Sequence, residues 1–201
     1  VALRGGAVQF AGHDLTREPI HRRARAGLAR TFQVPREFGR LSVLENLLAA
    51  APNPHHETLL GAWFGRAAAA RHDAQLAARA NEWLELTRLS ALRDQPAAAL
   101  SGGQKKLLEF ARALMGSPRC ILLDEPFAGV NPVLIEQLIE VLRAIHDRGI
   151  ALVVIEHHLQ ALRALVSRLV VMDQGRVIAQ GSPQEVLDDP RVAEAYMGGV
   201  I

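Results

Sequence analysis

Two adjacent carboxylates directly follow an apolar segment in the second half of the chain. Residues 120–123 read Cys-Ile-Leu-Leu, which is typical of a buried strand, and Asp124, Glu125 and Pro126 come next. Open α/β sheets bind ligands at the edge where such strands end. There, Asp124 is expected to hold Mg²⁺, directly or through water, and Glu125 to orient or deprotonate a water that attacks a γ-phosphate. Taken alone, the Asp-Glu-Pro string is also compatible with a solvated turn that only ends the strand.

A second candidate for phosphate chemistry lies upstream of these carboxylates. Leu100, Ser101, Gly102, Gly103 and Gln104 stand at the start of a predicted helix. Ser101 and the two glycines can expose backbone N–H groups at the positive end of that helix, which favours an anion. The alternative is a helix cap without a ligand. The carboxylates that follow favour the anion site.

The elements that must position these residues alternate between helix and strand after Ser101. Apolar patterns predict a helix over 105–115, a strand over 120–123, a helix over 132–148 and a strand over 150–155. Both strands are continuous apolar runs, as expected of parallel strands covered on both faces. A hairpin over 169–179 and C-terminal helices from Ser182 follow.

The first hundred residues contain shorter elements. They are predicted as a strand and turn over 7–12, a helix over 19–26, a strand over 28–32, a helix over 42–51 and an amphipathic helix over 73–88. Ser42 and Glu45 form a capping box at the start of the fourth element. The chain is therefore predicted to be α/β, with a partial core over 1–33, a helical subdomain over 34–100 and the rest of the core over 101–201.

Composition excludes several classes of protein. A chain of 201 residues that is 49% hydrophobic and 22% charged can close one sizeable core and is not disordered. No apolar stretch approaches the roughly 20 residues of a membrane-spanning helix. A net charge of +2 and an aromatic content of 4% argue against nucleic acid as a partner. The single cysteine, Cys120, and the absence of a signal-like start indicate the cytosol.

Five motifs, in order, resemble those of ABC (ATP-binding cassette) ATPases. Residues 100–104 are similar to the signature motif and residues 120–126 to the Walker B segment. Residues 32–33 resemble the Q-loop, residues 128–132 the D-loop and residues 155–157 the switch-histidine loop. The resemblance covers essentially the whole chain. It implies a P-loop NTPase-like core with a mostly parallel sheet, ATP and Mg²⁺ as ligands, and ATP hydrolysis between two paired cassettes.

The resemblance also assigns roles to single residues. It implies that Gln33 offers a neutral oxygen to Mg²⁺ and that His157 donates to the γ-phosphate or holds the attacking water. Asn131 is expected to bind ATP from the D-loop, and it also reads as a helix cap before Pro132. His158 stands where the family often has an acidic residue and is left out of the site. The predicted site consists of catalytic Glu125, His157 and Gln33, ATP-binding Ser101, Gly102, Gly103, Gln104 and Asn131, and the Mg²⁺ ligands Asp124 and Gln33.

One family motif has no counterpart in the chain. A P-loop, Gly-x-x-x-x-Gly-Lys-Ser/Thr, cradles the phosphates in such ATPases, and no such string occurs here. In the family it lies shortly before a segment like residues 2–10. We therefore expect that the chain lacks the N-terminal part of its core and is inactive alone. The alternative is a non-catalytic, regulatory cassette.

Residues 30–33, 42–47, 126–132, 155–157 and 181–198 together resemble the ATPase subunits of branched-chain amino-acid importers. Urea or amide importers and the lipopolysaccharide-export ATPase are alternatives within the family. The resemblance implies a second ATPase subunit, identical or not, two permease subunits and, indirectly, a substrate-binding protein, with the chain peripheral on the cytoplasmic face of the membrane. An ABC protein that acts on DNA or ribosomes is the alternative of another class; the short insert and single cassette argue against it.

The segment over 34–40 has no clear periodicity and joins the sheet to the helical subdomain. By resemblance, the coupling helix of the permease is expected to dock here, with Phe38 and Leu41 as its apolar anchor. The alternative is that Phe38 packs into the core of the helical subdomain.

Overall fold

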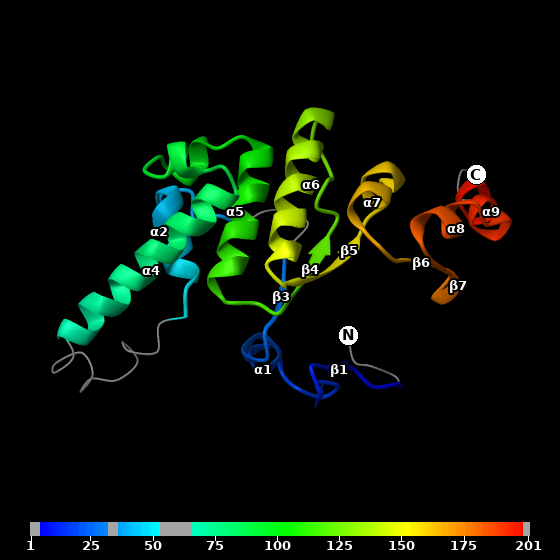
Figure 1. Cartoon of the computed structure of the whole chain (residues 1–201), viewed down its shortest axis with the longest axis horizontal. Helices are drawn as coiled ribbons and strands as arrows, with labels where there is room; N and C mark the ends of the chain where they lie inside the picture. The colour runs from blue at the N-terminus through cyan, green and yellow to red at the C-terminus, as the bar shows by residue number, and fades with distance from the viewer. Residues whose placement is uncertain (1–4, 32–35, 53–65, 199–201) are drawn as a thin grey trace.

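A three-stranded parallel sheet forms the centre of the structure, a computed structural model that describes residues 5–31, 36–52 and 66–198 (Figure 1). Its strand order is β3 (Leu28–Arg30), β4 (Cys120–Asp124) and β5 (Ala151–Ile155). Cys120 pairs with Leu28 on one side and Ala151 on the other, and Asp124 pairs with Ile155. The carboxyl ends of β4 and β5 therefore lie at one edge, as predicted.

The strand predicted over 28–32 is shorter in the structure. It ends at Arg30, although the backbone N–H of Thr31 still donates to the carbonyl of Leu122 at 2.9 Å. Phe32 and the next three residues lie outside the described part of the chain. The alternation of helix and strand after Ser101 is confirmed by α5 (Gly102–Met115) and α6 (Pro132–Asp147), which precede β4 and β5. Both helices place large apolar side chains in the main core.

A group of helices lies beside α5, to the left of the sheet in Figure 1. It contains α2 (Val43–Ala50) and α4 (Arg66–Leu86), both of which contact α5, and the short helices η2 (Ser90–Leu92) and η3 (Ala97–Ala99). The capping box of Ser42 and Glu45 is present, as predicted. The predicted helix over 73–88 is confirmed but begins earlier. Ala80 and Leu84, on its apolar face, are buried.

The N-terminal segment forms a hairpin and one short helix. Strands β1 (Gln9–Phe10) and β2 (His13–Asp14) pair antiparallel, and α1 (Ile20–Arg25) follows. Gly27, directly after the helix end, has a φ of +96°, a conformation in which glycine avoids the strain of a side chain.

The C-terminal segment forms a separate layer beyond β5 (Figure 1). Helix α7 (Leu159–Leu165) leads to the antiparallel pair β6 (Leu169–Asp173) and β7 (Arg176–Gly181), and then to α8 (Pro183–Leu187) and α9 (Pro190–Gly198). The predicted hairpin and the helix start at Ser182 are confirmed, and Ser182 and Glu185 form a capping box there. A small core of its own holds this layer together, and it contains Leu162, Leu169, Val171, Ala179, Val186 and Val192.

A groove separates β5 from β6. Within the described residues β5 pairs only with β4, and β6 only with β7. Apolar side chains line this β5–β6 groove, among them Val153, Val154, Ile155, Val170 and Met172. Because Val153 is 51% and Ile155 65% exposed, the expectation that β5 is covered on both faces is wrong for the described part of the chain. The apolar run of β5 is present, but in the described part of the chain the face that carries Val153 and Ile155 stays largely open to solvent.

Candidate functional site

The catalytic candidate Glu125 follows β4 in a left-handed backbone conformation, with φ +47°. Its N–H donates to the carbonyl of Ile155 at the end of β5 (2.9 Å). Its own carbonyl accepts from Nζ of Lys106 on α5 (3.3 Å) and from the N–H of Ala128 (3.2 Å). A non-glycine residue keeps this conformation only where surrounding contacts fix it. Strand β5 and helix α5 thus hold the turn that presents the Glu125 side chain, and the Ala128 bond closes the turn itself.

The structure brings Glu125 and His157 together. His157 comes just after β5, and its Nδ1 lies 4.0 Å from Oε1 of Glu125. The His157 side chain is 72% exposed and that of Glu125 is 33% exposed, so both are open to a ligand at the sheet edge. The arrangement provides a carboxylate able to accept a proton from water beside an imidazole able to donate a hydrogen bond.

Asp124 lies at the end of β4 and pairs with a cation from the neighbouring strand. Its Oδ2 accepts from Nη2 of Arg30 at 3.0 Å. The Asp124 side chain remains 32% exposed, so a small cation can reach it, and carboxylate oxygens are ligands that Mg²⁺ prefers. The donor chemistry therefore fits Mg²⁺. Gln33, the other predicted ligand, lies outside the described residues.

Two further charged residues belong to this site, and sequence reasoning missed both. The carboxylate of Glu156, whose side chain is only 1% exposed, accepts from the N–H groups of Phe127, His157 and His158 at 2.9, 2.8 and 3.1 Å. Lys106 is buried on α5, and that burial lowers its pKa, while the carboxylates of Glu109, Glu156 and Glu125 oppose the shift. The only sequence feature that pointed to Glu156 was its position beside His157. Lys106 had no such feature, because a lysine one turn into a helix is normally exposed to solvent.

The signature residues lie at the N-terminus of α5, where Ser101 and Gly102 are exposed. The predicted cap is present: Ser101 Oγ accepts from the Gln104 N–H, and Gln104 Oε1 accepts from the Ser101 N–H. Gly103 is buried instead, and a Cβ there would lie 1.6 Å from Cδ2 of Leu134 on α6. A side chain at this position would therefore displace the Leu134 side chain, apart from any role of Gly103 in ATP binding.

Asn131 caps α6, since its Oδ1 accepts from the N–H of Leu134 at 2.9 Å and Pro132 begins the helix. Leu134 is the same residue that packs on Gly103, so the starts of α5 and α6 are in contact. His158, which was left out of the predicted site, caps α7 by accepting from the N–H of Ala161. The capping interpretation of Asn131 is thus confirmed, and its role toward ATP stays a prediction.

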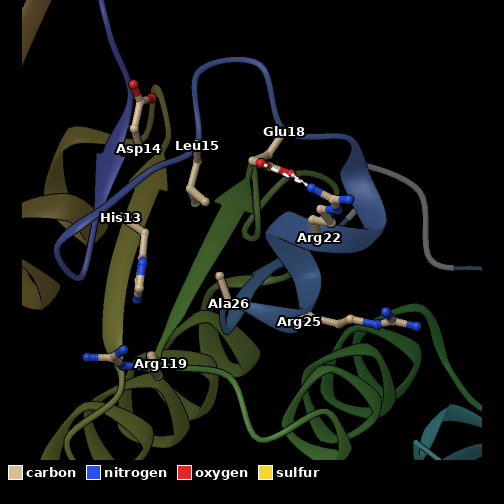
Figure 2. Close-up of a pocket in the computed structure, with 8 residues that line it drawn as sticks. All are labelled: His13, Asp14, Leu15, Glu18, Arg22, Arg25, Ala26 and Arg119. Atoms are coloured by element: carbon tan, nitrogen blue, oxygen red, sulfur yellow. Dashed lines mark hydrogen bonds and ion pairs between the residues drawn. The ribbon is translucent and has the colours of Figure 1, made fainter.

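A separate pocket of about 610 Å³ lies between the β1–β2 hairpin and α1 (Figure 2). It contains Arg22, Arg25 and Arg119, which is the kind of charge that attracts anions. Figure 2 shows, however, that the three guanidinium groups point to different sides of the pocket, and that Arg22 pairs with Glu18, at 3.3 Å. The arginines do not converge on one ligand.

Two possible features do not occur in the part of the chain that the structure describes. It contains no group of three or more His, Cys, Asp or Glu residues arranged to hold a metal ion. It also contains no helix with the length and apolar character needed to cross a membrane.

The chain is similar to known proteins in sequence and in structure. A family model described as "ABC transporter" matches residues 2–128, and one described as "Branched-chain amino acid ATP-binding cassette transporter" matches residues 176–200. The chain is 38% identical over 193 residues to a probable branched-chain amino acid transport ATP-binding protein (LivG) of Archaeoglobus fulgidus, covering 96% of the chain and 74% of that protein. It is 36% identical to the lipopolysaccharide export system ATP-binding protein (LptB) of Escherichia coli, with the same coverage.

Solved structures give the same result. A nucleotide-free ATP-binding cassette from an ABC transporter superposes with a TM-score of 0.80 at 36% identity, over 98% of this chain and 78% of that one. The ADP conformation of the cassette MJ1267 also gives 0.80, at 34% identity, over 97% and 78% of the two chains.

Proposed function

The chain belongs to the family of ATP-binding subunits of ABC transporters, and from this premise we propose that it hydrolyses ATP to power an importer of branched-chain amino acids. Membership of the family implies binding and hydrolysis of ATP. The observation that supports a catalytic role most directly is the approach of Glu125 and His157 at one sheet edge, 4.0 Å apart. The substrate class is supported by the second family match, over residues 176–200, and by relatives named for that transport.

In the proposed reaction, Glu125 orients the water that attacks the γ-phosphate and accepts its proton. The contacts of its backbone with Ile155 and Lys106 keep the carboxylate at the sheet edge. His157 donates a hydrogen bond to the γ-phosphate or to the water from the neighbouring strand. Both side chains act from fixed strand ends, so little reorganisation is needed when nucleotide arrives.

Asp124 would hold Mg²⁺, directly or through water, and Gln33 would add its amide oxygen. When bound, the ion supplies positive charge that offsets the charge of the phosphates. Asp124 already pairs with a positively charged group, the guanidinium of Arg30, and this supports a cation site at this edge, beside the catalytic residues. Arg30 would be replaced by Mg²⁺ at the Asp124 carboxylate, and the affinity of an Arg30 variant for Mn²⁺ tests this replacement.

Two copies of the subunit, or this one and a related one, would enclose ATP between them. The exposed Ser101 and Gly102 at the N-terminus of α5 support this part of the proposal. The Ser101 N–H is bound by the Gln104 side chain, but the Gly102 N–H, which needs no partner within the helix, and the Ser101 hydroxyl can donate to phosphate oxygens of a nucleotide on the partner. Gln104 and Asn131 cap their own helices and would contact the same nucleotide only at its rim. Gly103 would contribute through the close packing of α5 on α6.

The triphosphate also needs a P-loop, and residues 1–201 contain no such string. We place it in polypeptide outside these residues, on a strand that occupies the β5–β6 groove. The groove supports this placement because both of its walls are strand edges lined by apolar side chains such as Val154 and Val170. A parallel strand there would pair with β5 and bring the P-loop to the edge that carries Glu125.

The subunit would bind the cytoplasmic face of two permease subunits through the loop around Phe38. The Phe38 side chain is half exposed, with the guanidinium of Arg112 5.0 Å from the ring centroid, which favours docking over a place in the core. The Phe38 backbone is held by Asn46, whose Oδ1 accepts from its N–H at 2.9 Å. A substrate-binding protein would deliver the amino acid to the permeases on the other side of the membrane.

The export of lipopolysaccharide is a second candidate function, because the 35% and 36% identity of LptB proteins falls within the 34–38% range of the amino-acid transport ATPases. The test is reconstitution of the native subunit with its permeases in liposomes that contain ATP. We expect uptake of leucine or valine that requires the binding protein and is lost in Glu125→Gln. Active ATPase without amino-acid uptake would refute the importer, extraction of lipopolysaccharide would establish the second candidate, and absence of hydrolysis would refute the catalytic role.

A further inference from the structure

The carboxylate of Glu156 joins two loops that come from different strands. Its Oε1 accepts from the N–H of Phe127 at 2.9 Å, and its Oε2 accepts from the N–H groups of His157 and His158 at 2.8 and 3.1 Å. The side chain is 1% exposed, so water contributes little to these interactions. Each oxygen of this buried carboxylate therefore serves a separate loop.

These two loops carry the catalytic candidates. Phe127 stands two positions after Glu125, and His157 itself provides one of the donors. The parallel strands β4 and β5 end at Asp124 and Ile155, where the ladder between them stops apart from the bond from Glu125 N–H to the carbonyl of Ile155. Beyond that point, the Glu156 carboxylate is a side-chain link that holds the two loops at a fixed separation.

Charge and burial explain why this link is rigid. A buried carboxylate is costly unless it is hydrogen-bonded and paired, and backbone N–H groups that bind an ionised carboxylate make strong hydrogen bonds. The ammonium of buried Lys106 is attracted by the carboxylates of Glu156, Glu109 and Glu125, and it donates to the Glu125 carbonyl at 3.3 Å. Through Lys106, helix α5 thus helps to hold the turn that carries Glu125.

We propose that Glu156 is a positioning residue for ATP hydrolysis, which sets the separation of Glu125 and His157 by binding the backbone N–H groups of both loops. The proposal rests on the proposed ATPase function. Glu156 acts through the two catalytic side chains and does not itself touch the nucleotide. Since reaction rates depend steeply on such alignment, loss of the link should reduce turnover without weakening the binding of ATP.

Two substitutions of Glu156 separate its contacts. In Glu156→Gln the amide has one accepting oxygen and one NH₂ group, so either Phe127 or the His157 and His158 pair faces a donor instead of an acceptor. In Glu156→Asp the carboxylate is one methylene shorter, so it can still accept from its own loop but not reach Phe127. Both variants therefore lose the link between loops, and only the first also loses the charge.

The experiment compares these variants with the wild-type native subunit and with two controls. Glu136→Gln removes an exposed carboxylate on α6, and Val186→Ala weakens the separate C-terminal core without touching the site. We measure ATP turnover, the ATP dissociation constant, trapping of ADP with vanadate, and Tm. For both Glu156 variants we expect turnover to fall at least about tenfold and vanadate trapping to be lost, with the dissociation constant within about twofold of wild type. Both controls should keep turnover and trapping, although Val186→Ala lowers Tm.

Several results would overturn the proposal. Turnover within about twofold of wild type in Glu156→Gln and Glu156→Asp would show that alignment does not depend on the link. A parallel loss of ATP binding, or failure of both variants to fold, would make Glu156 a structural residue. Absence of hydrolysis in the wild-type subunit would instead refute the proposed function on which this proposal rests, and so the two failures are distinguishable.

Discussion

The guanidinium of Arg30 lies 3.0 Å from the carboxylate of Asp124, so the side chain expected to face Mg²⁺ is paired with a cation from the neighbouring strand. Both side chains are partly exposed, and pairs of this kind are typically worth up to about 1 kcal/mol. In the proposed function, Arg30 and a divalent cation would therefore compete for the same carboxylate.

Replacing Arg30 with Gln should strengthen binding of the cation. Removal of a nearby positive charge favours Mg²⁺ or its probe Mn²⁺, and we expect the Mn²⁺ dissociation constant, measured with ATP bound, to fall roughly two- to fivefold. Arg30→Lys keeps the charge and serves as the control. A higher dissociation constant in Arg30→Gln would mean that Arg30 holds Asp124 in place for the cation rather than competing with it.

In the native subunit with its P-loop, Glu125→Gln should leave ATP binding intact and nearly abolish hydrolysis. The amide keeps the shape of the carboxylate but cannot accept a proton, so an ATP-bound dimer should accumulate. Phosphate release and size-exclusion chromatography with ATP measure the two effects, with the exposed Glu194→Gln as the control. Turnover at the wild-type rate would remove Glu125 from the role of base.

The two glycines of the signature segment should respond differently to alanine. A Cβ on Gly102 meets nothing within 4 Å, whereas one on Gly103 would lie 1.6 Å from Leu134 Cδ2. Gly103→Ala should lower Tm by several degrees, since overpacking costs about 1–3 kcal/mol. Gly102→Ala should leave Tm unchanged and weaken only the ATP-dependent association of subunits. Equal Tm values for the two variants would contradict the packing argument.

Residues 1–201 alone should bind ATP very weakly. They contain no P-loop string, so most contacts to the phosphates are missing. Titration calorimetry of this fragment should give no measurable heat at micromolar ATP, and a version that includes a P-loop segment should bind. Micromolar affinity of the fragment itself would show that the described residues bind the nucleotide without a P-loop.

Phe38→Ala should reduce substrate uptake and co-purification with the permeases. The ring is half exposed, and so its removal should leave the Tm and ATPase activity of the free subunit unchanged. Leu47→Ala, at a fully buried position of α2, is the contrasting variant and should lower Tm. If Phe38→Ala lowers Tm by a similar amount, the residue contributes to the core and the docking site lies elsewhere.

Local patterns made much of this structure predictable. The apolar run that ends at Asp124 and Glu125 predicts a strand with carboxylates at its end, and Ser42, Ser101 and Ser182 predict helix starts that all form capping boxes. These features depend on residues close in sequence, where propensity and side-chain chemistry act directly.

Contacts between distant segments were not predictable from one sequence. Arg30 pairs with Asp124 from the neighbouring strand, and Lys106 on α5 donates to the carbonyl of Glu125, which follows β4. Neither contact has a signature in the sequence around its residues. The exposure of Ile155 depends on what packs beside β5, which the apolar run itself does not specify. Such pairings follow from the tertiary arrangement and not from local propensity.

The β5–β6 groove has a consequence for how the polypeptide behaves in a test tube. Within the described residues, the strand edges that form its walls have no neighbouring strand on that side. These walls also carry exposed apolar side chains such as Ile155 and Met172. Edges of this kind template pairing with other molecules and are sites of aggregation. Residues 1–201 produced alone should therefore form β-rich aggregates at a rate that rises with protein concentration, even though their helical end remains fully folded.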